Sequence, residues 1–164
     1  MKKIIKGVFF NFLIIVPFIL ITRVQALSVD NNNITIDNGK SANILLYANT
    51  NQDVSKVDFT LVFSSYDIEA DFIVNDKYND SISGTMHSIT FDEAKSGKIL
   101  LGTVSISVKS DPSELSGIVN IHSASARDND DNVVNLNNQV INVSVNMITI
   151  TTSTTTTSTT TTKT

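Results

Sequence analysis

The side chains best able to do chemistry in this chain are two histidines and a set of scattered acids. His87 and His122 fall on different predicted strands, and neither belongs to a nucleophile elbow or a triad signature. We therefore expect both histidines at the surface. No pair of acids has the placement that glycoside hydrolysis needs, and the chain has no cysteine to act as a thiol nucleophile. These residues predict a protein that is not an enzyme.

One turn concentrates oxygen ligands of the kind that calcium prefers. Residues 127–132 read Arg-Asp-Asn-Asp-Asp-Asn, and the carboxylates are those of Asp128, Asp130 and Asp131. The glycine and the final glutamate of an EF-hand loop are missing, so an acidic β-turn without a metal is the stronger interpretation. We expect no cofactor, and a calcium ion held by these three aspartates is the weaker alternative.

The first 26 residues have the pattern of a secretory signal peptide. Three lysines precede a nearly continuous apolar run over residues 7–21, and Val-Gln-Ala at 24–26 resembles a cleavage site. The alternative is a retained N-terminal anchor, because the apolar run approaches the length of a membrane span. We expect cleavage after Ala26, an extracellular mature protein and no other contact with the membrane.

Removal of this leader leaves a strongly acidic protein. The leader holds four of the twelve Lys and Arg and none of the sixteen Asp and Glu, so the mature chain has a formal net charge of −8. Such a chain repels phosphate backbones, and we do not expect it to bind nucleic acid. With no disulfides, its core alone must hold it together, and the body of about 120 residues is large enough to do so. We expect a monomer.

Apolar and polar residues alternate along much of the body, which is the pattern of half-buried β-strands. Strands are predicted over residues 27–37, 42–48, 55–63, 68–74, 87–92, 99–109, 118–126, 133–136 and 140–150. Asn38-Gly39 is a turn signal, and the polar residues 75–84 are predicted to form a surface loop. Nine to ten short strands with no helical period predict an all-β sandwich.

Two of these strands matter most for the core and the surface. In residues 55–63, the side that we expect to be buried comprises Val57, Phe59, Leu61 and Phe63. In residues 99–109, Leu100, Val104, Ile106 and Val108 are expected to face inward, and Leu101, Thr103 and Ser105 outward. Gly102 falls on the inward side, where it leaves room for a neighbour or marks a bulge.

The composition changes abruptly after the last predicted strand. Of the fourteen residues from Thr151 to the end, eleven are threonine, and none is apolar. Such a segment cannot form a core, so it is predicted to be a disordered linker or stalk, and its threonines are suited to O-glycosylation. The predicted organisation is a signal peptide over residues 1–26, a β-sandwich over 27–148 and a Thr-rich tail over 149–164.

Several segments of the body follow one another in a set order: an apolar strand at 42–48, Asp-Phe-Thr-Leu-x-Phe at 58–63, SITF at 88–91, GKILLGTVSISV at 97–108 and a closing strand at 141–145. Through these residues the chain resembles a cohesin domain over about residues 27–146, which is nearly all of the mature body. The resemblance implies a nine-stranded jelly-roll β-sandwich. It also implies a secreted, non-catalytic module that docks dockerin-bearing proteins in an extracellular polysaccharide-degrading assembly.

The resemblance further implies which surface binds the partner. In the family, this surface is one sheet face that includes the third, fifth, sixth and eighth strands. The outward positions that we place on it are Lys56, Asp58, Thr60, Thr90, Leu101, Thr103, Ser105 and His122. Asp58 is the position that matches an acidic residue of the family's face. For each of the others, a solvated side chain that merely alternates with a core residue is the competing interpretation.

Two other functions remain open. Carbohydrate-binding modules share the jelly-roll sandwich, and a polysaccharide would then be the ligand. The composition disfavours this function, because the chain has no tryptophan and only three tyrosines on which sugars could stack. The second alternative is a structural or adhesive cell-surface domain, which the Thr-rich tail permits equally.

Overall fold

A computed structural model of the chain describes residues 25–149, which form nine β-strands and no helix. The strands are β1 (Ala26–Val29), β2 (Asn33–Asp37), β3 (Ser41–Phe63), β4 (Ile68–Val74), β5 (Asn79–Ser83), β6 (Met86–Val108), β7 (Ser116–Arg127), β8 (Val133–Asn135) and β9 (Gln139–Asn146). The predicted all-β fold is therefore confirmed over this part of the chain. Nearly all of the predicted signal peptide and of the Thr-rich tail lies outside the described residues.

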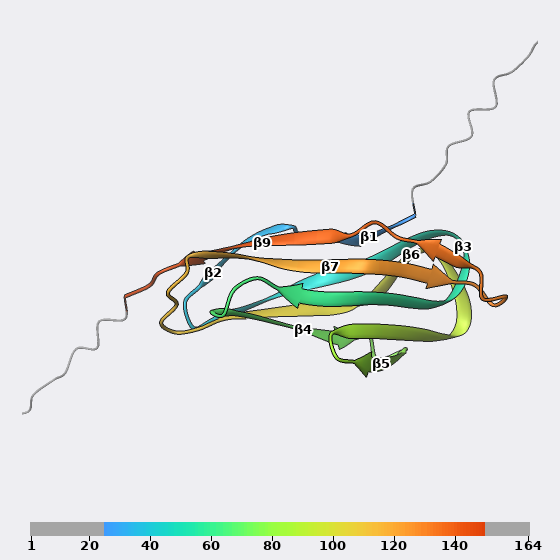
Figure 1. The fold of residues 1–164 in the computed structure, drawn as a ribbon, viewed down its shortest axis with the longest axis horizontal. Helices are drawn as coiled ribbons and strands as arrows, with labels where there is room; N and C mark the ends of the chain where they lie inside the picture. Colours follow the sequence, from blue (N-terminus) through green and yellow to red (C-terminus); the bar gives the residue numbers. More distant parts are fainter. Residues whose placement is uncertain (1–24, 150–164) are drawn as a thin grey trace, which may run out of the picture.

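The domain is elongated, and most strands run along its long axis (Figure 1). Two strands of 23 residues each, β3 and β6, connect its two layers. The first part of β3 pairs with β1 and with the second part of β6, whereas the second part of β3 pairs with β7 and the first part of β6. The pairing of β3 with β6 is irregular around Val54, where both strands bend from one layer into the other.

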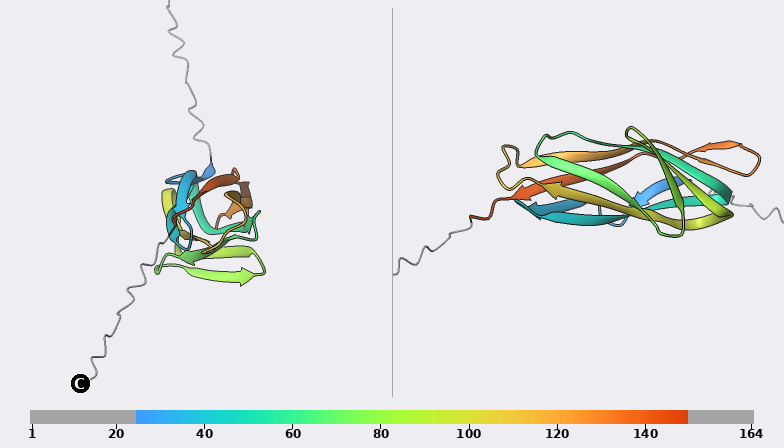
Figure 2. Two further views of the ribbon diagram at one scale, coloured as in Figure 1. Left: turned by 90° about the vertical axis from the view of Figure 1, so that its left-hand side faces the viewer. Right: turned by 90° about the horizontal axis from the view of Figure 1, so that it is seen from below.

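We call the two layers the front sheet and the rear sheet. The front sheet contains β8, β7, residues 54–63 of β3, residues 86–95 of β6 and β5. The rear sheet contains β1, residues 41–50 of β3, residues 97–108 of β6 and β4. Strand β9 pairs antiparallel with β7 and parallel with β2, so these two strands extend the front sheet on its β7 side (Figure 2).

The core lies between the inner faces of the two layers. Val57, Phe59 and Leu61 are buried there, as the alternation predicts. The Phe59 ring meets the Phe72 ring of β4 edge-on, with 5.0 Å between the ring centroids, which joins the front sheet to the rear sheet. The expectation for Phe63 is wrong, because this side chain is 45% exposed. Strand β6 begins opposite Thr60, so the end of β3 has lost its neighbour on that side.

A β-bulge in β6 reverses the alternation that the sequence suggests. Leu46 pairs with Gly102 and Tyr47 pairs with Leu100, which leaves Leu101 without a partner residue on β3. Leu101 is 0% exposed, so its predicted outward position is wrong. The predicted tight contact and bulge at Gly102 are confirmed. A Cβ atom there would lie 2.6 Å from the Phe72 ring and would also overlap the carbonyl oxygen of Ile73.

Two connections also differ in how well the sequence predicts them. The turn at Asn38-Gly39 is confirmed, with a positive φ of 70° at Gly39. The predicted loop over residues 75–84 is only partly a loop, because β5 forms within it and pairs with the start of β6. Strand β5 is short and polar, and it is the edge of the front sheet.

Among the described residues, no helix has the length and apolarity to cross a bilayer.

Candidate functional site

The outward surface of the front sheet, here called the front face, gathers five of the eight predicted partner-binding residues. The register places Lys56 beside Thr90 of β6 and Arg127 of β7, and it places Thr60 beside His122 of β7. Asp58 lies between these two rows, next to Ser88 and Ser125. The five predicted residues on this face are Lys56, Asp58, Thr60, Thr90 and His122. Their role in binding a partner stays a prediction.

The other three predicted residues do not belong to the front face. Leu101 is buried, as described above. Thr103 pairs with Leu45 and Ile73, and Ser105 pairs with Asn43 and Asp71, so both lie on the rear sheet. The prediction treated residues 99–109 as a strand of the binding sheet. In the structure this segment is the second part of β6, which has already crossed into the other layer.

Asp58 is the charged centre of the front face, and its carboxylate is held from three sides. The Ser88 hydroxyl donates a hydrogen bond of 2.7 Å to Oδ1. The Nζ of Lys56 lies 3.3 Å from the same oxygen, and the Nε of Arg127 lies 3.6 Å from Oδ2. The side chain is only 15% exposed. The face therefore presents a fixed carboxylate between two cations, with the hydroxyl groups of neighbouring residues around it.

A buried polar pair lies directly behind this centre. The Nδ1 of His87 lies 2.7 Å from Oδ2 of Asp80, and each side chain is 6% exposed. The imidazole stacks on Phe59 and meets Phe72 edge-on, at centroid distances of 5.2 and 5.1 Å. The surface position expected for His87 is therefore wrong. The period-two pattern contained the signal, because residue 87 has the same parity as the inward Ile89.

Asp80 also connects the buried pair to the front face. Its Oδ1 accepts a hydrogen bond of 3.1 Å from the backbone N–H of Ser88, whose hydroxyl donates to Asp58. Asp80, Ser88 and Asp58 belong to β5, β6 and β3, so this chain of contacts crosses three neighbouring strands. Sequence reasoning missed Asp80 because it lies in the stretch predicted to be a loop.

The apolar part of the front face comes from residues that the sequence analysis did not single out. Val62 lies beside Asn120, which lies beside Val140 of β9, and Ile118 occupies the next outward position on β7. Ile118, Val140 and Met86 are exposed. These side chains replace Leu101 as the apolar contribution to the surface.

A second bulge shapes the front face at His122. Asp58 pairs with Ser125 and Thr60 pairs with His122, so β7 has one residue more than β3 between these positions. Ser123 adopts a positive φ of 53°, and its hydroxyl lies 2.9 Å from Nδ1 of His122. The bulge places two consecutive polar side chains, those of His122 and Ser123, on the outside. Bulges of this kind commonly redirect side chains at functional surfaces.

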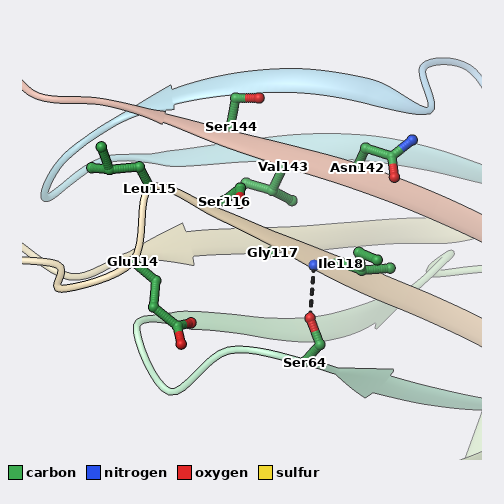
Figure 3. Close-up of a pocket in the computed structure, with 9 residues that line it drawn as sticks. All are labelled: Ser64, Glu114, Leu115, Ser116, Gly117, Ile118, Asn142, Val143 and Ser144. Atoms are coloured by element: carbon green, nitrogen blue, oxygen red, sulfur yellow. Dashed lines mark hydrogen bonds between the residues drawn. The ribbon is translucent and has the colours of Figure 1, made fainter.

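A hollow of about 680 Å³ lies over β7 and β9 at one end of the front face. Its lining residues are Ser64, Glu114, Leu115, Ser116, Gly117, Ile118, Asn142, Val143 and Ser144 (Figure 3). Glu114 and Leu115 come from the connection between β6 and β7, and Ser64 comes from the turn after β3. Sequence reasoning did not identify this hollow, because three separate segments form it.

The buried carboxylate of Asp67 holds the connection that borders the hollow. Its Oδ2 accepts hydrogen bonds from the hydroxyl and the backbone N–H of Ser113, at 2.6 and 2.8 Å, and from the N–H of Glu114 at 3.1 Å. The Nζ of Lys109 lies 3.3 Å from Oδ1. These contacts, led by those from Ser113, lower the pKa of Asp67 to about 2 although burial acts in the opposite direction.

In the turn considered for calcium, the side-chain oxygens of Asp128 and Asp131 make hydrogen bonds and an ion pair within the protein. Oδ1 of Asp128 accepts hydrogen bonds from the N–H groups of Asp130 and Asn132, and Oδ2 accepts one from the amide of Asn132, each at 2.9 Å. The bonds from Asn132 lower the pKa of Asp128. Asp131 pairs with Arg127 at 3.3 Å. Within residues 25–149, no three histidine or acidic side chains are grouped to hold a metal, so Asp128, Asp130 and Asp131 do not form a shared site.

We compared the chain with known proteins by sequence and by structure. No protein-family model matches the sequence, and no curated protein matches it either. Among solved structures, a cohesin module from a family 33 glycoside hydrolase of Clostridium perfringens is similar, with 14% sequence identity and a TM-score of 0.61. The match covers 77% of this chain and 100% of that chain.

Two further cohesins extend the comparison. The sixth cohesin of Acetivibrio cellulolyticus scaffoldin B, solved in complex with a Cel5 dockerin, has 16% identity and a TM-score of 0.56, covering 77% of this chain and 100% of that chain. A non-cellulosomal cohesin of the archaeon Archaeoglobus fulgidus has 14% identity and a TM-score of 0.55, covering 77% and 93%. Structural similarity at such low sequence identities establishes the fold alone. The chain therefore has the cohesin fold, a jelly-roll β-sandwich.

Proposed function

We propose that residues 27–148 form a distant cohesin that docks a dockerin-type module of a partner protein on the front face, without catalysing a reaction. The fold supports this proposal, and one of the similar cohesins was solved with a dockerin bound to it. The observation that carries the proposal is the Asp58 carboxylate held at the centre of the front face, with Lys56, Thr60, Thr90 and His122 around it.

The chemistry of the front face suits a protein partner. A specific interface buries about 800 Å² on each side and combines an apolar centre with polar groups that fix its register. The front face offers exposed apolar side chains at Met86, Ile118 and Val140 beside the charged centre. The held carboxylate is preorganised, so little side-chain entropy is lost when a donor of the partner binds to it.

The sequence outside the described residues suggests where such a module acts. The predicted signal peptide over 1–26 directs the protein out of the cell. The Thr-rich tail over 149–164 suits a spacer between modules. Together with the fold, these features support an extracellular module in a polysaccharide-degrading assembly.

Binding to purified dockerin modules encoded in the same genome tests the proposed function. We expect the mature chain to bind at least one of them in isothermal titration calorimetry. Asp58→Ala should weaken that binding at least tenfold, because losing one member of a buried, hydrogen-bonded charge pair costs about 2–5 kcal/mol. Glu69→Ala removes an exposed carboxylate from the rear sheet and is the matched control. Absence of binding to every module, or equal binding by Asp58→Ala, would contradict the proposal.

The carbohydrate-binding alternative receives little support from the aromatic residues. The Nζ of Lys98 lies 4.0 Å from the centre of the Tyr47 ring and so covers one of its faces. Tyr78 packs on Phe91, with 4.8 Å between the centroids. Tyr66 is 92% exposed and offers an isolated ring, which is a weak platform for stacking a sugar. Retention of the mature chain on insoluble cellulose or xylan would favour this alternative, and the adhesive alternative predicts neither retention nor dockerin binding.

A further inference from the structure

The hollow at the end of β7 is continuous with the front face. Ile118 and Asn142 are paired outward positions of β7 and β9, and Ser64 lies beside Ile118 just beyond the end of β3. They lie on the same side of the sheet as Asp58, six residues before Ser64. Six extended residues span about 20 Å. A partner that covers Asp58 and extends this far along β3 and β7 therefore reaches the hollow.

The lining of the hollow combines aliphatic surface with a single charge. Leu115 and Ile118 are exposed and form its apolar walls, while the remaining lining groups apart from Glu114 are small or uncharged. Glu114 is the only charged lining residue, and within residues 25–149 no cationic side chain forms an ion pair with it. In Figure 3 its carboxylate extends along the side of the hollow bordered by Ser64.

Hydrogen bonds hold the sides of the hollow in place. Two hydrogen bonds join Ser64 to Ile118. The N–H of Ser64 donates to the carbonyl oxygen of Ile118 at 2.9 Å, and the N–H of Ile118 donates to the hydroxyl oxygen of Ser64 at 3.0 Å. The N–H of Val145 donates to the carbonyl oxygen of Leu115 at 2.9 Å. The carboxylate of Asp67 accepts a hydrogen bond from the N–H of Glu114. The hollow is thus formed before any partner arrives, and this reduces the cost of ordering it on binding.

We propose that the hollow binds a lysine or arginine side chain of the docked partner, with Glu114 as the residue that recognises its charge. This inference rests on the proposed docking function. The methylene groups of such a side chain lie along Leu115 and Ile118, and its cationic group meets the carboxylate. Long basic side chains commonly bury their stems in this way while the charged end stays near water. The hollow is therefore a specificity-determining part of the front face, separate from the Asp58 centre.

Charge exchange tests the proposal with a dockerin that binds the mature chain. Glu114→Gln should weaken binding by about twofold to fivefold, as expected for an exposed ion pair. Glu114→Lys should weaken it further, and changing one Lys or Arg of the dockerin to Glu should restore part of the loss. Glu69→Gln, on the rear sheet, is the control and should leave binding unchanged. Unchanged affinity in both Glu114 variants, or a loss that no such dockerin variant restores, would overturn the proposal.

A second measurement separates the hollow from the docking function. Nα-acetyl-lysine methylamide is titrated into the ¹⁵N-labelled mature chain at about 10–100 mM, the range of weak fragment binding. We expect saturable NMR shifts at the amides of Ser116, Ile118 and Ser144. The norleucine analogue, which lacks the ammonium group, should not produce them, and neither should the lysine compound with Glu114→Gln.

Each result of this titration decides the inference about the hollow. Equal shifts with both compounds, or none with either, would overturn it. Shifts of these amides with cello- or xylo-oligosaccharides but not with the lysine compound would assign the hollow to a carbohydrate and overturn it as well. If no dockerin binds the mature chain while the lysine shifts occur as expected, the docking function fails and the chemistry of the hollow stands.

Discussion

Two buried carboxylates in different parts of the domain show how a single acid can hold several segments together. Asp80 joins His87 to Ser88 and, through it, to the charged centre of the front face. Asp67 joins the turn after β3 to the connection before β7 and so fixes one side of the hollow. Buried polar groups are stable only when their hydrogen bonds are made, so both acids limit how far their neighbours can move.

The low pKa of Asp67 predicts a specific dependence of stability on pH. The pKa is about 2 in the folded protein, against an ordinary value of 3.8. Folding therefore favours the charged form, and the resulting stability is fully present above about pH 4 and is lost as the pH falls through about 2. We expect Asp67→Asn to lower the melting temperature at pH 7, and the difference from the unmodified protein to shrink between pH 4 and pH 2.

Thermal unfolding followed by circular dichroism from pH 7 to pH 2 measures this effect. Asp76→Asn changes an exposed acid in the connection before β5 and is the matched control, for which no such convergence is expected. A constant difference between Asp67→Asn and the unmodified protein over the whole range would contradict the role assigned to the charge.

The elements that matter most are β3 and β6, because each of them contributes to both layers. Their bends place the first part of β6 in the front sheet and the second part in the rear sheet. The bulge at Leu101 and Gly102 then sets which side chains of the second part face the core. At Gly102, β6 lies so close to β4 that the backbone of Ile73 and the ring of Phe72 occupy the space of a side chain.

Gly102→Ala is expected to destabilise the domain because the added Cβ overlaps two neighbours. Overpacking of a closed core costs about 1–3 kcal/mol, and we expect the free energy of unfolding to fall by at least that amount. Urea denaturation followed by circular dichroism measures it. Ser105→Ala, at an outward position of the same strand, is the control and should change the stability little. Equal stability of Gly102→Ala and the unmodified protein would show that β4 can move away without cost.

The same elements explain what the sequence could and could not predict. Within one strand, alternation identified Val57, Phe59 and Leu61 as core residues, because a period of two follows directly from the pleat. It failed at Leu101, because the bulge shifts the alternation by one residue: Ile99 and Leu101 are buried before it, and Val104, Ile106 and Val108 are buried after it. Alternation placed Thr103 and Ser105 on an outward side correctly, but it could not assign them to the right sheet, since the bend that moves β6 into the other layer depends on pairing between distant residues.

At the candidate site, prediction succeeded where local pattern was enough. Asp58 and Thr60 were placed correctly on an outward side by alternation alone. Asp80 was missed because β5 is a polar edge strand whose pairing with β6 stabilises it. The hollow was missed because its sides come from segments that are distant in sequence, such as Ser64 and Asn142.

Seen as a whole, the molecule joins its first and last parts directly. Strand β2 lies parallel to β9, with Asn33 opposite Asn142 and Asp37 opposite Asn146. Side-chain hydrogen bonds connect both of these pairs, at 2.9 and 2.7 Å. The described chain begins at one end of the long axis and finishes at the other (Figure 1).

This arrangement has a mechanical consequence. A force applied to the two chain ends draws β2 and β9 in opposite directions along their lengths, so the bonds between them are loaded together in shear. A force between residue 116 and the C-terminal end instead peels β9 from β7, and the bonds break one after another.

We expect optical-tweezers measurements to give a higher unfolding force when the two chain ends are pulled than when residue 116 and the C-terminal end are pulled. Equal forces would contradict this. A module built in this way is therefore expected to keep its front face intact under tension applied along its long axis.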